Sequence, residues 1–199
     1  MKLKPRDVTL SAVFAVLTAI GAWVSIAVPF TPVPFTLQVF FVVLSGAVLG
    51  ARRGTLAQVV YVLLGLIGFP VFAGGESGPS VLVGPTGGYL LGFVLAAYVS
   101  GRIAEKQHSP SLKYLTAATL VGLMPIYALG EIGLWMWLRT RISVLLMVGV
   151  IPFLPGDIIK AIAAGFVASR GQLRRLTDKQ VTSTSDKSSA SGSVGPTLA

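Results

Sequence analysis

The stretch "IPFLPGDIIKAIAAGFVASRG", residues 151–171, is apolar almost throughout, yet it contains two opposite charges, Asp157 and Lys160. With Arg170 at the edge of a membrane, Lys160 lies about 15 Å deeper in a helix, near the bilayer centre. Positions i and i+3 share one helix face. A lone charge at that depth costs at least about 2.5–3.5 kcal/mol, and such residues usually face the protein interior. Two functions fit: a structural ion pair, or a ligand site in which Lys160 donates to a carboxylate and Asp157 accepts from N–H groups.

The composition points to a membrane around this helix. Of the 199 residues, 53% are hydrophobic and only 12% are charged, and the mean hydropathy is +0.79. A soluble domain carries about a quarter charged residues, so we expect an all-α integral membrane protein. The sequence has no Cys, one His, no His-Glu-x-x-His and no phosphate loop. We therefore expect no metal, no cofactor and no enzymatic activity.

Six apolar runs are long enough to be helices that cross or nearly cross a membrane. They are Val8–Val28, Leu37–Gly50, Thr55–Phe72, Gly87–Ser100, Leu115–Leu134 and Pro155–Ser169. We predict that residues 1–171 form one six-helix transmembrane domain. The Ser/Thr/Gly-rich segment 172–199 is predicted to be a disordered cytoplasmic tail, because it has too few large apolar residues to pack.

The basic residues orient the six predicted spans. An even number of spans puts both termini on one side, and 13 of the 16 Lys and Arg fall on that side. Two, Arg139 and Arg141, fall on the other. Since cytoplasmic loops carry an excess of Lys and Arg, we predict cytoplasmic termini in a multi-pass protein of the plasma membrane. The same distribution accounts for the net charge of +9 without any nucleic acid.

Segments rich in Pro and Gly precede the second, fourth and sixth predicted helices, at residues 29–38, 74–88 and 151–156. These helices are predicted to be short, at roughly 21 Å each. Non-helical backbone at membrane depth must be buried in protein or line a cavity. We therefore predict a loop-walled substrate pocket on the outer side, where helix N-termini favour an anion. The alternative is that ordinary connecting loops cover short tilted helices.

Further candidate residues lie in these segments. Gln38 has both a donor and an acceptor, which suits an amide or urea edge, although it could simply cap local backbone. Thr86 is a candidate N-cap of the fourth helix. Glu131 is a second intramembrane acid, either functional or directed to the surface. The predicted substrate-binding set is Asp157, Lys160, Gln38, Thr36, Tyr89, Thr86 and Phe35, with Phe153 as a further aromatic wall.

The first predicted helix carries a small-xxx-small step from Ala15 to Ala19. Small side chains at this spacing let another helix approach closely. The other helix belongs either to a partner protein or to the same bundle, and the sequence leaves both open.

Four motifs together resemble the BioY family, the biotin-binding S-components of energy-coupling-factor (ECF) vitamin transporters. They are "FTPVPFTLQ" (30–38), "GFPVFAGG" (68–75), "GPTGGYLLGF" (84–93) and "PFLPGDIIK" (152–160). The resemblance implies six helices with cytoplasmic termini, high-affinity capture of biotin from outside, and a role for Asp157 and Lys160 in binding it. It also implies that Ala15 and Ala19 dock on a transmembrane coupling subunit, with two separate ATPase subunits. It leaves homo-oligomerisation open.

A stand-alone ion-coupled secondary transporter of biotin or a similar small carboxylate is the alternative function. Asp157 and Glu131 would then relay protons, and the chain would need no ATPase partner.

Overall fold

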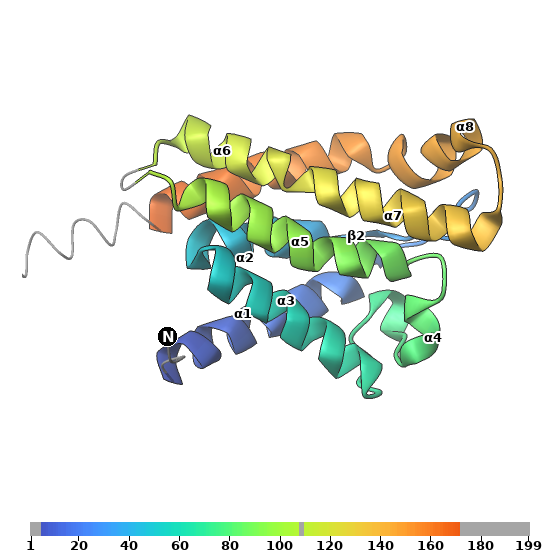
Figure 1. Ribbon diagram of the computed structural model, residues 1–199, viewed down its shortest axis with the longest axis horizontal. Helices are drawn as coiled ribbons and strands as arrows, with labels where there is room; N and C mark the ends of the chain where they lie inside the picture. Colours follow the sequence, from blue (N-terminus) through green and yellow to red (C-terminus); the bar gives the residue numbers. More distant parts are fainter. Residues whose placement is uncertain (1–4, 108–109, 172–199) are drawn as a thin grey trace, which may run out of the picture.

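The computed structural model describes residues 5–107 and 110–171; the predicted tail, 172–199, lies outside them. These residues form an elongated helical bundle (Figure 1). The main helices are α1 (Pro5–Trp23), α2 (Gln38–Leu49), α3 (Ala51–Leu66), α5 (Gly87–Ala104), α6 (Leu112–Val121), α7 (Leu123–Leu138) and a C-terminal helix, Leu154–Gly171. Shorter elements are β1 (Ser25–Ile26), β2 (Phe35–Thr36), η1 (Ala73–Gly75), α4 (Pro79–Leu82), α8 (Ile142–Leu145) and the π-helix η2 (Leu146–Val150).

Helix α5 is the centre of the bundle, because it packs against α2, α3, α6 and α7. The start of α1 and the end of the C-terminal helix lie at the same end of the bundle, whereas α4 and α8 lie at the opposite end (Figure 1). The connections gathered at that opposite end carry the residues of the functional site. We call it the α4/α8 end.

Three helices of the described chain are long and apolar enough to cross a membrane: α1, α5 and the α6–α7 pair, Leu112–Leu138. Ile142–Val150 and Leu154–Gly171, bent by 48°, make a fourth if they are counted as one span. The prediction of three short helices was wrong for the fourth and sixth. Helix α5 has 18 residues and continues past Ser100 to Ala104. Arg102 lies in the last turn of α5, where its positive charge stabilises the partial negative charge of the helix C-terminus.

Helices α5 and α7 cross at a pair of glycines. A Cβ atom added to Gly133 would lie 2.8 Å from the Cα of Gly88, and one added to Gly88 would lie 3.0 Å from the Cα of Gly133. Real side-chain atoms do not approach backbone that closely, so the two helices touch through backbone alone. In a membrane the hydrophobic effect does not drive helices together, because the lipid is as apolar as they are. Small residues such as these let the helices pack closely and associate through van der Waals contacts.

Two strands interrupt the predicted all-helical chain. Ser25 pairs with Thr36 and Ile26 with Phe35 in an antiparallel bridge. The segment between them contains Pro32 and Pro34, which cannot donate backbone hydrogen bonds and therefore discourage helix. The chain between the two strands forms a hairpin, residues 25–36. The pairing places the start of α2 next to the end of α1.

Helix α1 packs on α3 with its small residues inward. Ala15 is 1% exposed, and Ala19 is half-buried against the core. On the same face Thr18 accepts a hydrogen bond of 3.3 Å from the side-chain amide of Gln58 in α3. The burial of Ala15 favours the second interpretation of the small-xxx-small step, close helix packing within the same chain. The exposed residues of α1 include Ala12, Val13 and Val16.

The end of α1 is tied to the connection after α3. The indole Nε1 of Trp23 donates a hydrogen bond of 3.2 Å to the carbonyl of Pro70, although the Trp23 side chain is 72% exposed. Two residues further on, Phe72 is buried and stacks edge-to-face on Tyr61, with ring centroids 5.7 Å apart. The connection 67–78 is thus fixed to both α1 and α3.

Candidate functional site

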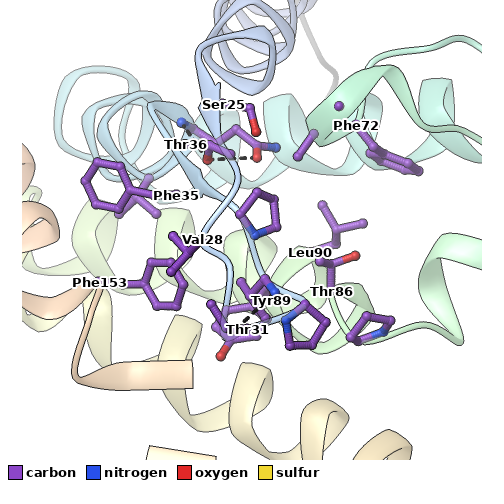
Figure 2. A pocket seen from close by; sticks show the side chains of 18 of the residues that line it. Ser25, Val28, Thr31, Phe35, Thr36, Phe72, Thr86, Tyr89, Leu90 and Phe153 are labelled. Carbon is purple, nitrogen blue, oxygen red and sulfur yellow. Dashed lines mark hydrogen bonds between the residues drawn. The ribbon is translucent and has the colours of Figure 1, made fainter. Parts of the chain in front are cut away.

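A cavity of about 340 Å³ opens at the α4/α8 end of the bundle, within the roughly 300–1,000 Å³ range of small-molecule sites. The hairpin 25–36, α2, residues 72–76, α4, α5, α7 and the C-terminal helix all contribute to its wall. Figure 2 shows Phe35 and Phe153 on one side and Phe72 on the opposite side. Six of the seven predicted substrate-binding residues line it: Phe35, Thr36, Gln38, Thr86, Tyr89 and Asp157.

Lys160, the seventh, lies behind this wall. Its ammonium group donates a hydrogen bond of 2.8 Å to Asp157 Oδ1 and another to the carbonyl oxygen of Thr36. It also lies 3.5 Å from the centroid of the Phe35 ring, a cation–π contact. Asp157 and Lys160 are 5% and 9% exposed, so the pair is buried. The predicted i, i+3 ion pair is therefore present, and Lys160 also ties the C-terminal helix to β2.

Gln38 is part of a directional hydrogen-bond chain. Its side-chain Oε1 accepts from Thr36 Oγ1 at 3.0 Å, and its Nε2 donates to the hydroxyl of Tyr61. Tyr61 in turn donates to the carbonyl of Val71 at 3.0 Å. Because a carbonyl can only accept, the end of the chain at Val71 fixes the direction of each bond before it. The second N–H of the Gln38 amide is free of these bonds and can serve a ligand acceptor.

Tyr89 and Glu131 form a second polar group at the wall. The Tyr89 hydroxyl lies 3.0 Å from Glu131 Oε1 and 3.0 Å from the carbonyl of Gly149 in η2. A single hydroxyl hydrogen serves one of these two acceptors at a time. Glu131 Oε2 is buried without a hydrogen-bond partner in the described part of the chain. The group joins α5, α7 and η2, and π-helical turns are frequent at functional sites.

Thr86 lines the cavity and is the N-cap residue of α5, as predicted, but its side chain does not cap the helix. It occupies the N-cap position with φ −96° and ψ −10°, and its side chain makes no capping hydrogen bond. A residue in this near-helical conformation does not present its hydroxyl to the next N–H groups as an extended N-cap does. Its hydroxyl is accordingly available to the cavity.

Tyr127 is the site residue that the sequence reasoning missed. It lines the cavity from α7 and donates a hydrogen bond of 2.7 Å to Asp157 Oδ2. A tyrosine within an apolar helix gives no signal beyond its own polar tip, so nothing in the sequence joins it to Asp157, 30 residues later. Glu76 also lines the cavity, and Phe72 and Phe93 extend its aromatic wall.

The arrangement suits a mostly apolar ligand with a few polar groups. Aromatic and aliphatic side chains form most of the wall, and its polar side chains are Ser25, Thr31, Thr36, Gln38, Glu76, Thr86, Tyr89, Tyr127 and Asp157. Among residues 5–107 and 110–171, no group of three or more His, Asp or Glu side chains could hold a metal ion. Both carboxylates in the wall, Asp157 and Glu76, are acceptors when ionised.

Comparison with known proteins identifies relatives along nearly the whole chain. Residues 1–177 match the model of the BioY family. A protein of Thermotoga maritima named "Biotin transporter BioY" is 48% identical over 165 residues, covering 83% of this chain and 95% of the relative. The "Probable biotin transporter BioY" of Pyrococcus horikoshii is 42% identical over 172 residues, covering 85% of this chain and 98% of the relative.

A solved structure has the same fold. It is titled "Crystal structure at 2.1 A of the S-component for biotin from an ECF-type ABC transporter", and it superposes with a TM-score of 0.79 at 27% sequence identity. The match covers 87% of this chain and 95% of that one. With its apolar helices, this chain is a multi-pass membrane protein of a family of transporters, not an enzyme. The resemblance in the four sequence motifs is thereby confirmed, and the chain belongs to the BioY family.

Proposed function

We propose that this chain binds biotin in the cavity at the α4/α8 end, captures it from outside the cell and delivers it inward. One observation carries the proposal: six residues chosen from the sequence as ligand contacts line a single cavity of about 340 Å³. They come from elements more than 100 residues apart, and folding brings them to one place. The names of the relatives, biotin transporters, support the choice of ligand.

The chemistry of biotin matches the cavity. Its fused rings and valeryl chain are apolar and suit the aromatic wall of Phe35, Phe72 and Phe153. Its ureido group has two N–H donors and one carbonyl, which suit Asp157 and the free N–H of Gln38. Thr86 and Tyr89 complete the polar contacts. Lys160 donates hydrogen bonds to Asp157 and to the Thr36 carbonyl on the side away from the cavity. It can bind the ligand carboxylate only if it gives up one of these two bonds.

The proposed topology has six spans in the plasma membrane, with both termini cytoplasmic and the cavity outward. Helices α2 and α3, of 12 and 16 residues, complete the count with α1, α5, α6–α7 and the C-terminal helix. The start of α1 and the end of the C-terminal helix at one end of the bundle (Figure 1) support an even number of passes. Arg139 and Arg141 then lie outside.

The energy source proposed for uptake is an ECF module, made of a transmembrane coupling subunit and two ATPases. The sequence has no phosphate loop of its own, and the structurally similar S-component is titled as part of an ECF-type transporter. Because Ala15 is buried within the bundle, we propose that the exposed face of α1 around Ala12 and Val16, with Ala19 at its margin, contacts the coupling subunit.

A calorimetric titration of the detergent-purified chain with biotin tests the binding proposal. We expect saturable one-site binding without ATP, metal or partner. Biotin amide serves as the comparison ligand: if Lys160 is released to the carboxylate, the amide binds about ten- to hundredfold more weakly, since hydrogen bonds to charged groups contribute about 1.5–3 kcal/mol. Folded protein that shows neither heat nor a thermal shift with biotin would rule the proposal out.

Ion-coupled transport is the second candidate, and Glu131 is the observation that favours it. A buried carboxylate oxygen without a partner in the described chain, beside Tyr89 at the cavity wall, is a reasonable place for a proton to bind. Collapsing the proton gradient while ATP is held constant distinguishes the two. Uptake that stops favours ion coupling, and uptake that continues favours the ECF module.

A further inference from the structure

We infer that Tyr127 is a positioning residue that prepares Asp157 to receive an N–H donor of a cyclic urea, and that it thereby sets the ligand specificity of the cavity. The inference rests on the proposed function, since it assigns biotin's ureido group to this end of the site. It begins from the two oxygens of one carboxylate. Asp157 Oδ1 accepts from Lys160 at 2.8 Å, and Asp157 Oδ2 accepts from Tyr127 at 2.7 Å.

Each oxygen of Asp157 therefore has one donor and one further acceptor position. A carboxylate has about four lone-pair sites in total, so two remain for a ligand. Asp157 lines the cavity, whereas Lys160 holds it from behind, through bonds that also reach the carbonyl of Thr36. Asp157 can therefore accept a ligand N–H from the cavity, and a cyclic urea, whose two N–H bonds point away from each other, directs one of them to it.

The Tyr127 hydroxyl completes this acceptor surface. Because its hydrogen is donated to Asp157, its oxygen can only accept from a ligand. Tyr127 and Asp157 then present only acceptor oxygens to the ligand. A ligand that also placed an acceptor here would leave its own acceptor and these buried oxygens without hydrogen bonds. Unpaired buried polar groups are the strongest basis for rejecting a close analogue. This part of the wall therefore selects for a ligand group that directs an N–H donor toward Asp157.

Tyr127 is one of several hydroxyls near the site, but its contact is distinct. Tyr89 bonds to Glu131 and Gly149, and Tyr61 bonds to Gln38 and Val71. Without the Tyr127 bond, Asp157 Oδ2 is held by no other hydrogen bond within the described residues, and the carboxylate is held by Lys160 at Oδ1 alone. The expected consequence is weaker binding through disorder of Asp157.

The test is a double-mutant cycle on biotin affinity, measured by calorimetry on Tyr127→Phe, Asp157→Ala and the combined variant. Tyr127→Phe alone is expected to weaken biotin about tenfold, and to have less than about a twofold effect once Asp157 is absent, since it acts through that carboxylate. Tyr114→Phe is the matched control. The Tyr114 hydroxyl, in α6, donates to the carbonyl of Ile103 in α5, and neither residue lines the cavity. Equal losses for Tyr127→Phe with and without Asp157 overturn the inference.

A ligand-side measurement on the unmodified chain keeps the inference testable if Asp157→Ala does not fold. The probes are the two mono-N-methylated forms of biotin, each lacking one ureido donor. We expect the form that lacks the N–H facing Asp157 to bind at least about tenfold more weakly than biotin, with a smaller penalty in Tyr127→Phe. Equal binding of biotin and both methylated forms shows that Asp157 takes no N–H from the ligand and overturns the inference. Absence of any biotin binding would instead contradict the proposed function.

Discussion

At the scale of single residues, the Lys160 side chain joins parts of the chain that are 124 residues apart, at Thr36 and at the C-terminal helix. Lys160→Met removes its bonds to Asp157 and Thr36 but keeps most of the side-chain length. We expect a lower melting temperature, because removing one partner of a buried ion pair costs about 3–5 kcal/mol. We also expect a loss of biotin affinity of about ten- to hundredfold, because Asp157 loses a charged hydrogen bond that contributes about 1.5–3 kcal/mol. Calorimetry and thermal unfolding of the purified variant measure the two effects.

Arg139→Met is the matched control, since it also removes one positive charge. Arg139 stacks over Trp135 with its guanidinium carbon 5.6 Å from the ring centroid, away from the residues that line the cavity, and its effect on affinity should stay within about twofold. The double change Asp157→Asn with Lys160→Met separates the two roles of the pair. Recovery of both stability and affinity would show that the pair is purely structural and contradict its role in the ligand site.

The sequence pointed to residues that line the cavity where a charge or an amide interrupts an apolar run. Asp157 and Gln38 stand out because burying them is costly without a partner. Tyr127 carries no such signal, since a tyrosine is common in apolar helices and its role depends on α7 lying beside the C-terminal helix. Lys160 was expected to face the ligand directly. Its position behind Asp157 and Phe35 depends on packing that a single helix does not determine.

At the scale of elements, the α5–α7 crossing depends on the absence of side chains. Gly88→Ala places a methyl group against the carbonyl oxygen of Leu129, closer than van der Waals contact allows, and 3.0 Å from the Cα of Gly133, so we expect destabilisation of about 1–3 kcal/mol from overpacking. Thermal unfolding should then occur several degrees lower, at about 2–4 °C per kcal/mol for a chain of this size. Gly171→Ala is the control, because no atom lies within 4 Å of its added Cβ. An equal melting temperature for both variants would contradict the close crossing.

Helix α1 offers a second comparison between two alanines. Ala15→Leu inserts a large side chain where the residue is 1% exposed against α3, so we expect a lower melting temperature by the same overpacking mechanism. Ala12→Leu lies on the exposed face and should leave stability within about 0.5 kcal/mol. If the exposed face contacts a coupling subunit, Ala12→Leu reduces co-purification with it at unchanged stability. The opposite pattern, with Ala15→Leu stable and unable to associate, would restore the original docking prediction.

Element positions could be predicted from hydropathy, but element ends and contacts could not. The second helix was placed at Leu37–Gly50 and is found at Gln38–Leu49, because Pro-rich sequence precedes it and Gly50 follows. The fourth helix continues beyond its predicted end, since Gly101 and Arg102 reduce local hydropathy without breaking a helix. The paired strands at residues 25–26 and 35–36 were missed, because two residues are too few to show any period.

At the scale of the whole molecule, the proposed topology predicts which end of the bundle faces the medium. The chain has no cysteine, so a single introduced thiol is unambiguous. Arg141→Cys, at the α4/α8 end, should react with a membrane-impermeant maleimide on intact cells. Lys106→Cys, which follows α5 at the other end (Figure 1) and also loses one positive charge, should react only after the cells are opened. Labelling of Lys106→Cys on intact cells would invert the topology.

The bond from the Trp23 indole to Pro70 has a consequence for spectroscopy. The connection that Trp23 holds carries Phe72, Ala73 and Gly74 into the cavity wall, so movement of that wall changes the partner of the indole N–H. Indole fluorescence responds to hydrogen bonding and polarity at this group, which makes Trp23 an intrinsic optical reporter of an occupied cavity. With Trp135→Phe and Trp137→Phe removing the other two tryptophans, ligand entry becomes readable in real time without any attached dye.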